Sequence, residues 1–246
     1  MPPQPWYVRT YNQDYLDIYG AHLDARTVVE LESILKSTEL AAGARILDLA
    51  CGHGRHAIPL ALQGFHVTGL DLSPLFLRRA RQQAHSANAK VRWKSGDIRQ
   101  LPFRGEFEAV LSLYNAYGFF EDENDNLHVL EGVVRALCPR GVFFLDLLGL
   151  QPINTQTGSS QAERPGYKLE ETVAFNPTAK RLAIDQTITR PGSPPRHLHH
   201  NLRLFEPAEI RHSLESVGLE VLSQWGGFDG CSTEQGDRLI TIARKS

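Results

Sequence analysis

Short apolar runs alternate with longer amphipathic stretches over the first 150 residues of the chain. The apolar runs have the length of buried strands, and the stretches between them place apolar residues at helical spacing. We predict strands at residues 45–49, 65–70, 91–94, 107–111 and 142–147. We predict helices at residues 27–37, 55–63, 73–86 and 125–137. Strands separated by helices of this length form βαβ units, which predicts a parallel, doubly wound sheet.

The pattern changes after Gly149. Residues 151–166 are polar and rich in turn residues, which indicates a flexible loop. Three stretches then alternate apolar and polar residues with Asn-Pro and Pro-Gly turns between them, as antiparallel strands do. These stretches are residues 167–175, 182–189 and 197–205, and a helix at 206–217 and a terminal antiparallel pair at 219–224 and 238–243 follow them.

These elements predict an α/β fold with a Rossmann-like, doubly wound, mostly parallel seven-stranded sheet. The sheet ends in the antiparallel strand pair and carries an inserted antiparallel β elaboration after its fifth strand. A chain of 246 residues suits a single domain of this kind. We expect four segments within it: an N-terminal segment (1–26), a ligand-binding core (27–148), the insertion (149–205) and a C-terminal helix with the strand pair (206–246).

Composition narrows the classes of partner. The formal net charge is −2 and no long basic run occurs, so a nucleic-acid or anionic-membrane partner gains no electrostatic support. Three cysteines without a CxxC spacing form neither a disulfide framework nor a zinc signature. The longest apolar run, residues 142–150, contains Asp146 and is too short to span a bilayer, and no signal-peptide pattern opens the chain. We therefore expect a cytoplasmic protein with no metal, membrane or nucleic-acid partner.

A glycine turn follows the first predicted strand, in the sequence ILDLACGHGRHA at residues 46–57. Glycine adopts backbone conformations closed to other residues and lets a ligand lie against the main chain. The spacing Gly52-x-Gly54-x-x-Ala57 fits a loose dinucleotide fingerprint. Asp71 lies nineteen residues after Gly52 at the end of the second strand, where a carboxylate accepts hydrogen bonds from a ribose. On this motif alone, a nicotinamide-dependent oxidoreductase stays open.

Three further features favour another cofactor. First, Asp48 extends the turn to Asp48-x-Ala50-x-Gly52-x-Gly54. Second, the third strand ends with a second carboxylate, in Ser95-Gly96-Asp97-Ile98. Third, an antiparallel strand pair is not the usual end of a dinucleotide domain. Together these features resemble the class I S-adenosylmethionine-dependent methyltransferases over residues 45–147. The whole chain resembles their small-molecule branch more loosely, in YNQDYLDIYGAHLDARTVVEL, CGHGRHAIPLALQGFHVTGLDLSP, LSLYNAYGFFEDENDN, RLFEPAEI and GGFDG. Ala50 departs from the pattern, because many members have glycine there.

The resemblance implies that S-adenosylmethionine is the cofactor and S-adenosylhomocysteine the product. Backbone contacts at the glycine turn, a ribose contact from Asp71 and an adenine contact from Asp97 are implied in the same way. Residues 1–26 resemble a lid that closes over the sulfonium, and the insertion would help to form the acceptor pocket. The implied cofactor-binding residues are Tyr11, Tyr19, Ala50, Gly52, Gly54, Asp71, Leu72, Asp97, Ile98, Leu113 and Tyr114.

The catalytic candidates are less well defined. Methyl transfer is an in-line displacement, so holding the acceptor near the methyl carbon removes much of the barrier. An amine or hydroxyl acceptor must also lose a proton to a base. Residues expected near the methyl group are Tyr15, Asn115, Tyr117 and His199. His199 alternates with other polar residues along one strand, so a solvated strand face is an equally good interpretation.

We therefore predict an S-adenosylmethionine-dependent methyltransferase that acts on nitrogen, oxygen or carbon of a small-molecule acceptor, as a monomer or homodimer. One alternative is the nicotinamide-dependent oxidoreductase, although a Tyr-x-x-x-Lys pair is absent. Another is a catalytically silent S-adenosylmethionine-binding protein. A nucleic-acid methyltransferase is disfavoured, because residues 113–116 read Leu-Tyr-Asn-Ala instead of a base-flipping motif such as Asn-Pro-Pro-Tyr.

Overall fold

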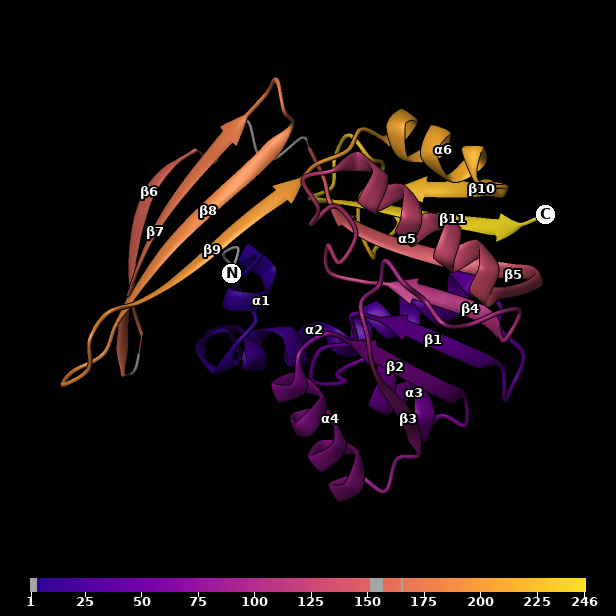
Figure 1. The fold of residues 1–246 in the computed structure, drawn as a ribbon, viewed down its shortest axis with the longest axis horizontal. Helices are drawn as coiled ribbons and strands as arrows, with labels where there is room; N and C mark the ends of the chain where they lie inside the picture. Colours follow the sequence, from indigo (N-terminus) through magenta and orange to yellow (C-terminus); the bar gives the residue numbers. More distant parts are fainter. Residues whose placement is uncertain (1–3, 151–156, 165) are drawn as a thin grey trace.

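The chain forms two separate sheets joined by its N-terminal helices (Figure 1). The structure is a computed structural model that describes residues 4–150, 157–164 and 166–246. One sheet has seven strands in the order β10-β11-β5-β4-β1-β2-β3, and the other has four in the order β6-β7-β8-β9. Among the described residues, no helix is both long and apolar enough to cross a membrane.

The seven-stranded sheet confirms the predicted fold class. Its first five strands are parallel, and β11 runs antiparallel to both β5 and β10. The strand order reverses at β1, which pairs with β2 on one side and β4 on the other. The strands are β1 (Arg45–Leu49), β2 (His66–Asp71), β3 (Val91–Ser95), β4 (Phe107–Ser112), β5 (Leu137–Leu148), β10 (Leu219–Trp225) and β11 (Arg238–Lys245).

Both faces of this sheet are buried. Successive residues of β1 point to opposite faces, as the pleat requires. Leu47 joins an apolar cluster that contains Val133 of α5 and Ile210 of α6, whereas Ile46 joins a cluster that contains Ile34 of α2. The helices are α1 (Trp6–Thr10), α2 (Gln13–Thr38), α3 (Ala57–Leu62), α4 (Pro74–Ser86), α5 (Glu123–Ala136) and α6 (Pro207–Ser216).

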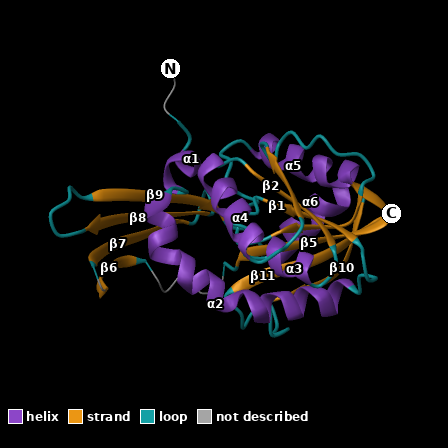
Figure 2. Cartoon of the chain, turned by 90° about the horizontal axis from the view of Figure 1, so that it is seen from below, coloured by secondary structure: helices purple, strands orange, loops and turns teal. Residues whose placement is uncertain are grey.

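Helix α2 is much longer than predicted. The apolar spacing indicated only residues 27–37, but the helix begins at Gln13, where the Asn12 side chain accepts a hydrogen bond from the Tyr15 amide. Its first half packs against the four-stranded sheet and its second half against the seven-stranded sheet, so no single apolar face runs along its whole length (Figure 2). A periodicity search therefore detects only the second half.

The four-stranded sheet contains one strand that the sequence did not predict. Strands β7 (Tyr167–Asn176), β8 (Arg181–Thr189) and β9 (Arg196–Arg203) confirm the predicted antiparallel set. The expected loop at 151–166 is wrong over β6 (Gly158–Arg164), which pairs along its whole length with β7. As an edge strand with both faces largely exposed, β6 needs no apolar alternation. Residues 151–156 and 165 lie outside the described residues.

The boundary between α5 and β5 also differs from the prediction. The predicted helix ended at residue 137 and the next strand began at residue 142, but α5 stops at Ala136 and β5 already begins at Leu137 and includes Pro139. Leu137 pairs with Phe107 of β4, and the register then shifts before the regular pairing resumes at Val142. Proline cannot donate to a sheet ladder, so it is tolerated in this irregular segment.

Replacement by alanine should change the free energy of unfolding in opposite directions at two glycines. A Cβ on Gly69 in β2 would lie 2.6 Å from the Trp93 ring and 2.9 Å from the Cys51 sulfur, whereas one on Gly20 in α2 would meet nothing within 4 Å. Gly69→Ala should therefore lower the free energy of unfolding by about 1–3 kcal/mol through overpacking. Gly20→Ala should raise it by up to about 1 kcal/mol through helix propensity. Urea denaturation measures both, and an unchanged midpoint for Gly69→Ala would contradict the packing described.

Candidate functional site

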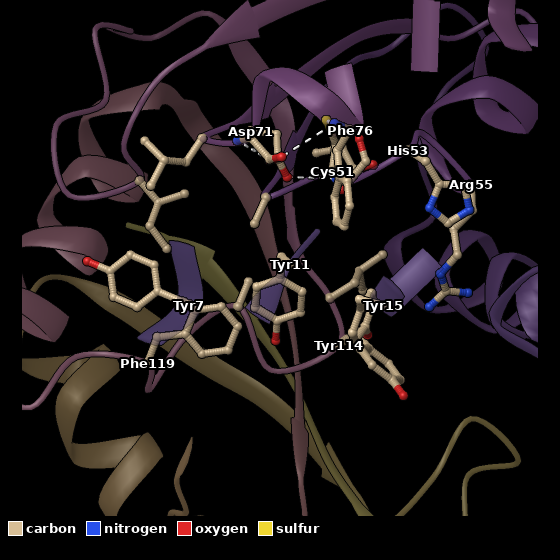
Figure 3. A pocket seen from close by; sticks show the side chains of 18 of the residues that line it. Tyr7, Tyr11, Tyr15, Cys51, His53, Arg55, Asp71, Phe76, Tyr114 and Phe119 are labelled. Atoms are coloured by element: carbon tan, nitrogen blue, oxygen red, sulfur yellow. Dashed lines mark hydrogen bonds between the residues drawn. The ribbon is translucent and has the colours of Figure 1, made fainter. Parts of the chain in front are cut away.

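A pocket opens beyond the carboxyl ends of β1, β2 and β4, beside the point where the strand order reverses. Open α/β sheets bind their ligands at this position. The N-terminal segment closes the pocket from the opposite side with Tyr7, Tyr11 and Tyr15 (Figure 3). The predicted cofactor residues that line it are Tyr11, Ala50, Gly52, Asp71, Leu72, Asp97, Ile98, Leu113 and Tyr114.

Backbone atoms of the glycine turn line the pocket. Ala50 and Gly52 both have positive φ angles, of 52° and 57°, and both line the pocket. Alanine adopts this conformation at a cost, so the turn is held in it by its surroundings. Gly54 does not line the pocket. A Cβ there would lie 2.7 Å from the Trp93 ring, so this glycine permits close packing between the turn and the sheet.

Asp71 connects the turn to the end of β2. Its Oδ2 accepts a hydrogen bond from the Gly52 amide at 2.8 Å, and its Oδ1 accepts one from the Ser73 amide at 2.7 Å. Burial raises the pKa of the Asp71 carboxyl, and these backbone hydrogen bonds oppose the rise. Each carboxylate oxygen has a second lone pair, so Asp71 can shape the turn and still accept from a ligand.

Asp97 is held differently, by an arginine. The guanidinium of Arg99 donates to both Asp97 oxygens and also reaches Asp125 at 2.7 Å. Burial opposes ionisation, but the hydrogen bonds from Arg99 prevail and lower the pKa of the Asp97 carboxyl. Arg99 also lies 4.7 Å from the centre of the Phe120 ring. The pocket therefore has an ionised acceptor at this end, next to Ile98.

Aromatic side chains form the wall opposite the glycine turn. Phe119 stacks against Tyr7 and Tyr11, with ring centres 6.1 and 5.5 Å apart, and Tyr11 meets Tyr15 edge-on at 4.9 Å. The sequence analysis missed Tyr7 and Phe119. The spacing of four residues that relates Tyr11 to Tyr15 also leads back to Tyr7, so this residue could have been found.

A buried ionic cluster lies at the other end of the pocket. Arg55 donates from Nη1 to the Leu23 carbonyl at 3.2 Å and to the Glu30 carboxylate, which also contacts Nε2 of His56 at 2.8 Å. Burial opposes ionisation of Glu30, but hydrogen bonds from His56 and Arg55 lower the pKa of its carboxyl to about 2. His53 pairs with Asp24 of α2 at 2.9 Å. His53 and His56 are both buried, because these α2 carboxylates cover them.

Tyr114 lies between two arginines. The guanidinium carbons of Arg55 and Arg238 are 5.7 and 5.6 Å from the centre of its ring. Tyr114 and Asn115 both have positive φ angles, of 57° and 64°. Asp146 holds this strained turn, because its carboxylate accepts from the Tyr114 amide at 2.9 Å and its carbonyl accepts from the Asn115 amide at 3.1 Å. Arg238 pairs with the same carboxylate at 2.6 Å.

Asp48 is a buried carboxylate in the floor of the pocket. Only 2% of its surface is exposed, and Oδ2 has no hydrogen-bond partner within the described part of the chain. Burial raises the pKa of the Asp48 carboxyl to about 7, although the charge of Arg55 opposes the rise. An unpaired buried carboxylate oxygen is costly, so its place in a pocket indicates a ligand group.

Several candidates lie away from the pocket. Tyr19 hydrogen-bonds to Gln186 of β8, and Tyr117 packs against Phe205 with ring centres 5.2 Å apart. The Asn115 side chain accepts from the Leu148 amide. His199 contacts Asp185 at 2.7 Å on the polar face of the four-stranded sheet. Tyr15 is thus the catalytic candidate that the fold brings to the pocket. Within the described ranges, no group of three or more His, Cys, Asp or Glu side chains is arranged to hold a metal ion.

Comparison with known proteins gives a consistent picture. Residues 46–141 match the family model described as a methyltransferase domain. The chain is 38% identical over 104 residues to a putative methyltransferase of Bacillus subtilis, YqeM, a match that covers 42% of each chain. It is 31% identical over 144 residues to a glycine/sarcosine N-methyltransferase of Parasynechococcus marenigrum, which covers 57% of this chain and 51% of the relative. The chain therefore spans about half or less of the length of these curated relatives.

Longer matches have lower identity. A dTDP-3-amino-3,4,6-trideoxy-alpha-D-glucopyranose N,N-dimethyltransferase of Streptomyces venezuelae is 25% identical over 234 residues, covering 89% of this chain and 96% of that protein. The solved structure of the CcbJ methyltransferase from Streptomyces caelestis superposes with a TM-score of 0.81 at 21% identity and covers 98% of both chains. At that identity the structural match shows the fold alone.

Removal of the Glu30 carboxylate should test the ionic cluster. Glu30→Ala leaves the Arg55 guanidinium, whose side chain is 7% exposed, without its carboxylate partner. Loss of one member of a buried ion pair costs about 3–5 kcal/mol of folding free energy. Glu108→Ala is the control, because its pair with Arg45 is exposed and should contribute far less. Urea denaturation of both variants decides the matter, and equal midpoints would show that the cluster does not anchor α2.

Proposed function

We propose, since the chain belongs to the S-adenosylmethionine-dependent methyltransferases, that it transfers a methyl group to a nitrogen atom of a small-molecule amine. The observation that carries the proposal is the pocket itself, where a glycine turn and two strand-end carboxylates meet at the switch point of the sheet. Nitrogen is favoured because the relatives include a glycine/sarcosine N-methyltransferase, a sugar N,N-dimethyltransferase and a cypemycin N-terminal methyltransferase.

The residues of the pocket fit this cofactor. Main chain at Ala50 and Gly52 would lie beside its methionine and ribose part, and Asp71 would accept from the ribose hydroxyls. Asp97 would accept from the adenine amino group, with Ile98 and Leu72 beside the ring. The unpaired Oδ2 of Asp48 would accept from the ammonium group of the methionine part. When bound, the cofactor supplies a methyl group on a positively charged sulfur, which leaves as a neutral thioether.

The aromatic wall supports the transfer in two ways. Aromatic faces stabilise a cation, and Tyr11, Tyr15 and Phe119 would also keep water from the reacting atoms. Burial raises the pKa of the Tyr15 phenol well above its usual value, so Tyr15 stays protonated and does not act as a base at neutral pH. Its hydroxyl would instead orient the acceptor by a hydrogen bond, which is the positioning that an in-line displacement needs.

The N-terminal segment and the insertion would form the acceptor side of the site. Trp6 donates from its indole to the Phe119 carbonyl at 3.3 Å, and Thr10 donates to the His199 carbonyl of β9 at 2.5 Å. Arg190, which follows β8, pairs with Asp14 of α2 at 2.5 Å. These contacts support a lid made of the N-terminal segment from Trp6 onward together with the four-stranded sheet. A protein that binds the cofactor without turnover is the second candidate function.

Ligand binding and turnover together test the proposal. S-adenosylhomocysteine should bind in the micromolar range by calorimetry, and NAD and NADP should give no measurable heat, because Asp71 and Asp97 end successive strands around one glycine turn and line one pocket. With labelled S-adenosylmethionine, a panel of small amines should yield methylated product and S-adenosylhomocysteine in equal amounts. Tight nicotinamide binding without a response to S-adenosylhomocysteine would contradict the cofactor assignment. Binding without transfer to any amine, alcohol or carbon acid would leave the non-catalytic candidate.

The Asp48 carboxyl predicts how cofactor affinity depends on pH. With a pKa near 7 in the folded chain, the carboxyl is about one-tenth ionised at pH 6 and about nine-tenths ionised at pH 8. Only the ionised form attracts the ammonium group, so S-adenosylhomocysteine affinity should rise up to about tenfold over this range. Asp48→Asn should bind more weakly with a flat profile. Calorimetry at both pH values measures this, and an equal rise in Asp48→Asn would assign it to another group.

The same carboxyl should make the ligand-free protein less stable as the pH rises, whereas cofactor affinity should increase. Its folded-state pKa lies above the usual value of 3.8, so the folded state holds the proton more strongly than the unfolded state. The stability that this proton contributes is complete below pH 4 and is lost as the pH rises toward about 7. In Asp48→Asn the free energy of unfolding should lack this fall, which urea denaturation at several pH values can show.

A further inference from the structure

We propose that Glu171 forms a cation subsite on the acceptor side of the pocket, where it binds a second, positively charged amino group of the acceptor while another amine of the same molecule receives the methyl group. The acceptor class is then the diamines and the larger amines that carry a second basic nitrogen. This proposal rests on the proposed function, because it names the class of acceptor for the same transfer. It also gives a binding role to the four-stranded sheet, which contains Glu171 in β7.

Glu171 lies on the face of the four-stranded sheet that the first half of α2 covers. In the register of the sheet, Glu171 of β7 pairs with Gln186 of β8, and Gln186 pairs with Leu198 of β9. Residues paired across strands point to the same face, and Leu198 is buried in one apolar cluster with Tyr15 of α2. The N-terminal helices join the two sheets (Figure 1). Glu171 therefore faces the segment that closes the pocket.

A series of side-chain contacts connects Glu171 with the aromatic wall of the pocket. The Gln186 amide donates from Nε2 to the Glu171 carboxylate at 2.5 Å and also to the Tyr19 hydroxyl. The centre of the Tyr19 ring lies 4.9 Å from that of Tyr15, which lines the pocket. Glu171 therefore lies beyond these two tyrosines, on the side of the pocket opposite the glycine turn.

The polar groups around Glu171 include more acceptors than donors. Only 3% of Gln186 is exposed, and its Oε1 has no hydrogen-bond partner within the described part of the chain. Among the described residues, the two Glu171 oxygens accept one hydrogen bond, from Gln186. Burial raises the pKa of the Tyr19 phenol to about 12, so this hydroxyl stays protonated at neutral pH and adds no negative charge. An ammonium group has three N–H donors and no acceptor, so it supplies what these groups lack.

The Glu171 carboxylate has no cationic partner among the residues that the structure describes. Lys168 of the same strand pairs with Glu170 at 3.0 Å on the opposite face, and Arg190 is held by carboxylates of α2. Ser160 of β6, which lies opposite Glu171, is neutral. Glu171 is half-buried, so water screens its charge only in part and a ligand can still reach it. An unpaired carboxylate in this position attracts a cation.

Methyl transfer requires that the two nitrogens of such an acceptor differ in charge. A nearby carboxylate favours the protonated form of an amine, and a protonated amine has no lone pair with which to attack the methyl carbon. The nitrogen at Glu171 therefore stays an ammonium and is not methylated. The other nitrogen would lie against the rings of Tyr11 and Tyr15, where desolvation favours its neutral form. Its lone pair forms the C–N bond while the C–S bond breaks, and the product ammonium then releases a proton to water.

A purely structural role for Glu171 makes a different prediction. In that role the carboxylate only orients Gln186 and Tyr19, and its removal slows the methylation of every amine by the same factor. Glu170 provides the matched control, because it neighbours Glu171 in β7 but lies on the other face of the sheet, where it pairs with Lys168. The two roles are separated by the ratio of kcat/KM for a diamine to that for the monoamine of equal length.

The experiment measures methylation, with labelled S-adenosylmethionine, of straight-chain diamines with three to six carbon atoms and of the monoamines of equal length. For the best diamine, the unmodified protein should show a kcat/KM per amine about tenfold to a hundredfold above that of the monoamine, as expected for hydrogen bonds to a charged group. In Glu171→Gln this ratio should fall to about one, because a neutral amide no longer attracts the second ammonium. Glu170→Gln should keep the ratio of the unmodified protein.

A chemical control on the unmodified protein covers the case in which Glu171→Gln does not fold. The mono-acetylated form of the best diamine keeps the reacting amine but lacks the second charge, so it should be methylated no faster than the monoamine. Methylation of this form as fast as the diamine would overturn the proposal. Equal kcat/KM values per amine for diamines and monoamines, or equal slowing of both by Glu171→Gln, would also overturn it while leaving the proposed function in place. If S-adenosylhomocysteine binds but no amine is methylated, the proposed function itself fails and the subsite falls with it.

Discussion

The Glu30 carboxylate is the interaction on which the shape of the pocket depends. It is 3% exposed and contacts Arg55 and His56, the residues that follow the glycine turn. The pocket is made of two parts, the strand ends of the seven-stranded sheet and the tyrosines of the N-terminal segment. The Arg55–Glu30 ion pair joins these two parts at a buried position, where little solvent screens the attraction. Helix α2 is long enough to carry this anchor and to reach the other sheet.

The first half of α2 is held by contacts with the four-stranded sheet and the residue that follows β8. Tyr19 bonds to Gln186 of β8, and Arg190 pairs with Asp14 and Asp17. One helix is therefore bound near its start to Arg190, which follows β8, and in its second half to Arg55 and His56 after the glycine turn. Tyr11 and Tyr15, which line the pocket, lie next to the attachment to the four-stranded sheet. Helix α2 therefore connects the four-stranded sheet to the pocket.

Three aspartates of the pocket differ in their hydrogen-bond partners and in the direction in which their pKa values are shifted. Asp71 is bound by backbone amides, Asp97 by a guanidinium, and one oxygen of Asp48 has no partner among the residues that the structure describes. Burial raises the pKa of Asp71 and Asp48, whereas the Arg99 pair lowers the pKa of Asp97. These differences suit three kinds of ligand group, namely hydroxyls, an ammonium and an amine on an aromatic ring.

The sequence by itself determined the parallel sheet, the glycine turn and the strand-end carboxylates, because these depend on local periodicity and on single-residue backbone preferences. It did not determine strand β6, whose exposed edge needs no apolar pattern, or the first half of α2. Asn115, Tyr117 and His199 were plausible catalytic candidates in the sequence, but the tertiary structure turned them toward Leu148, Phe205 and Asp185. Arg55 and His56 became part of the pocket only because Glu30, 25 and 26 residues away in the chain, pairs with both. Contacts at such separations follow from how the elements pack, and no local pattern encodes them.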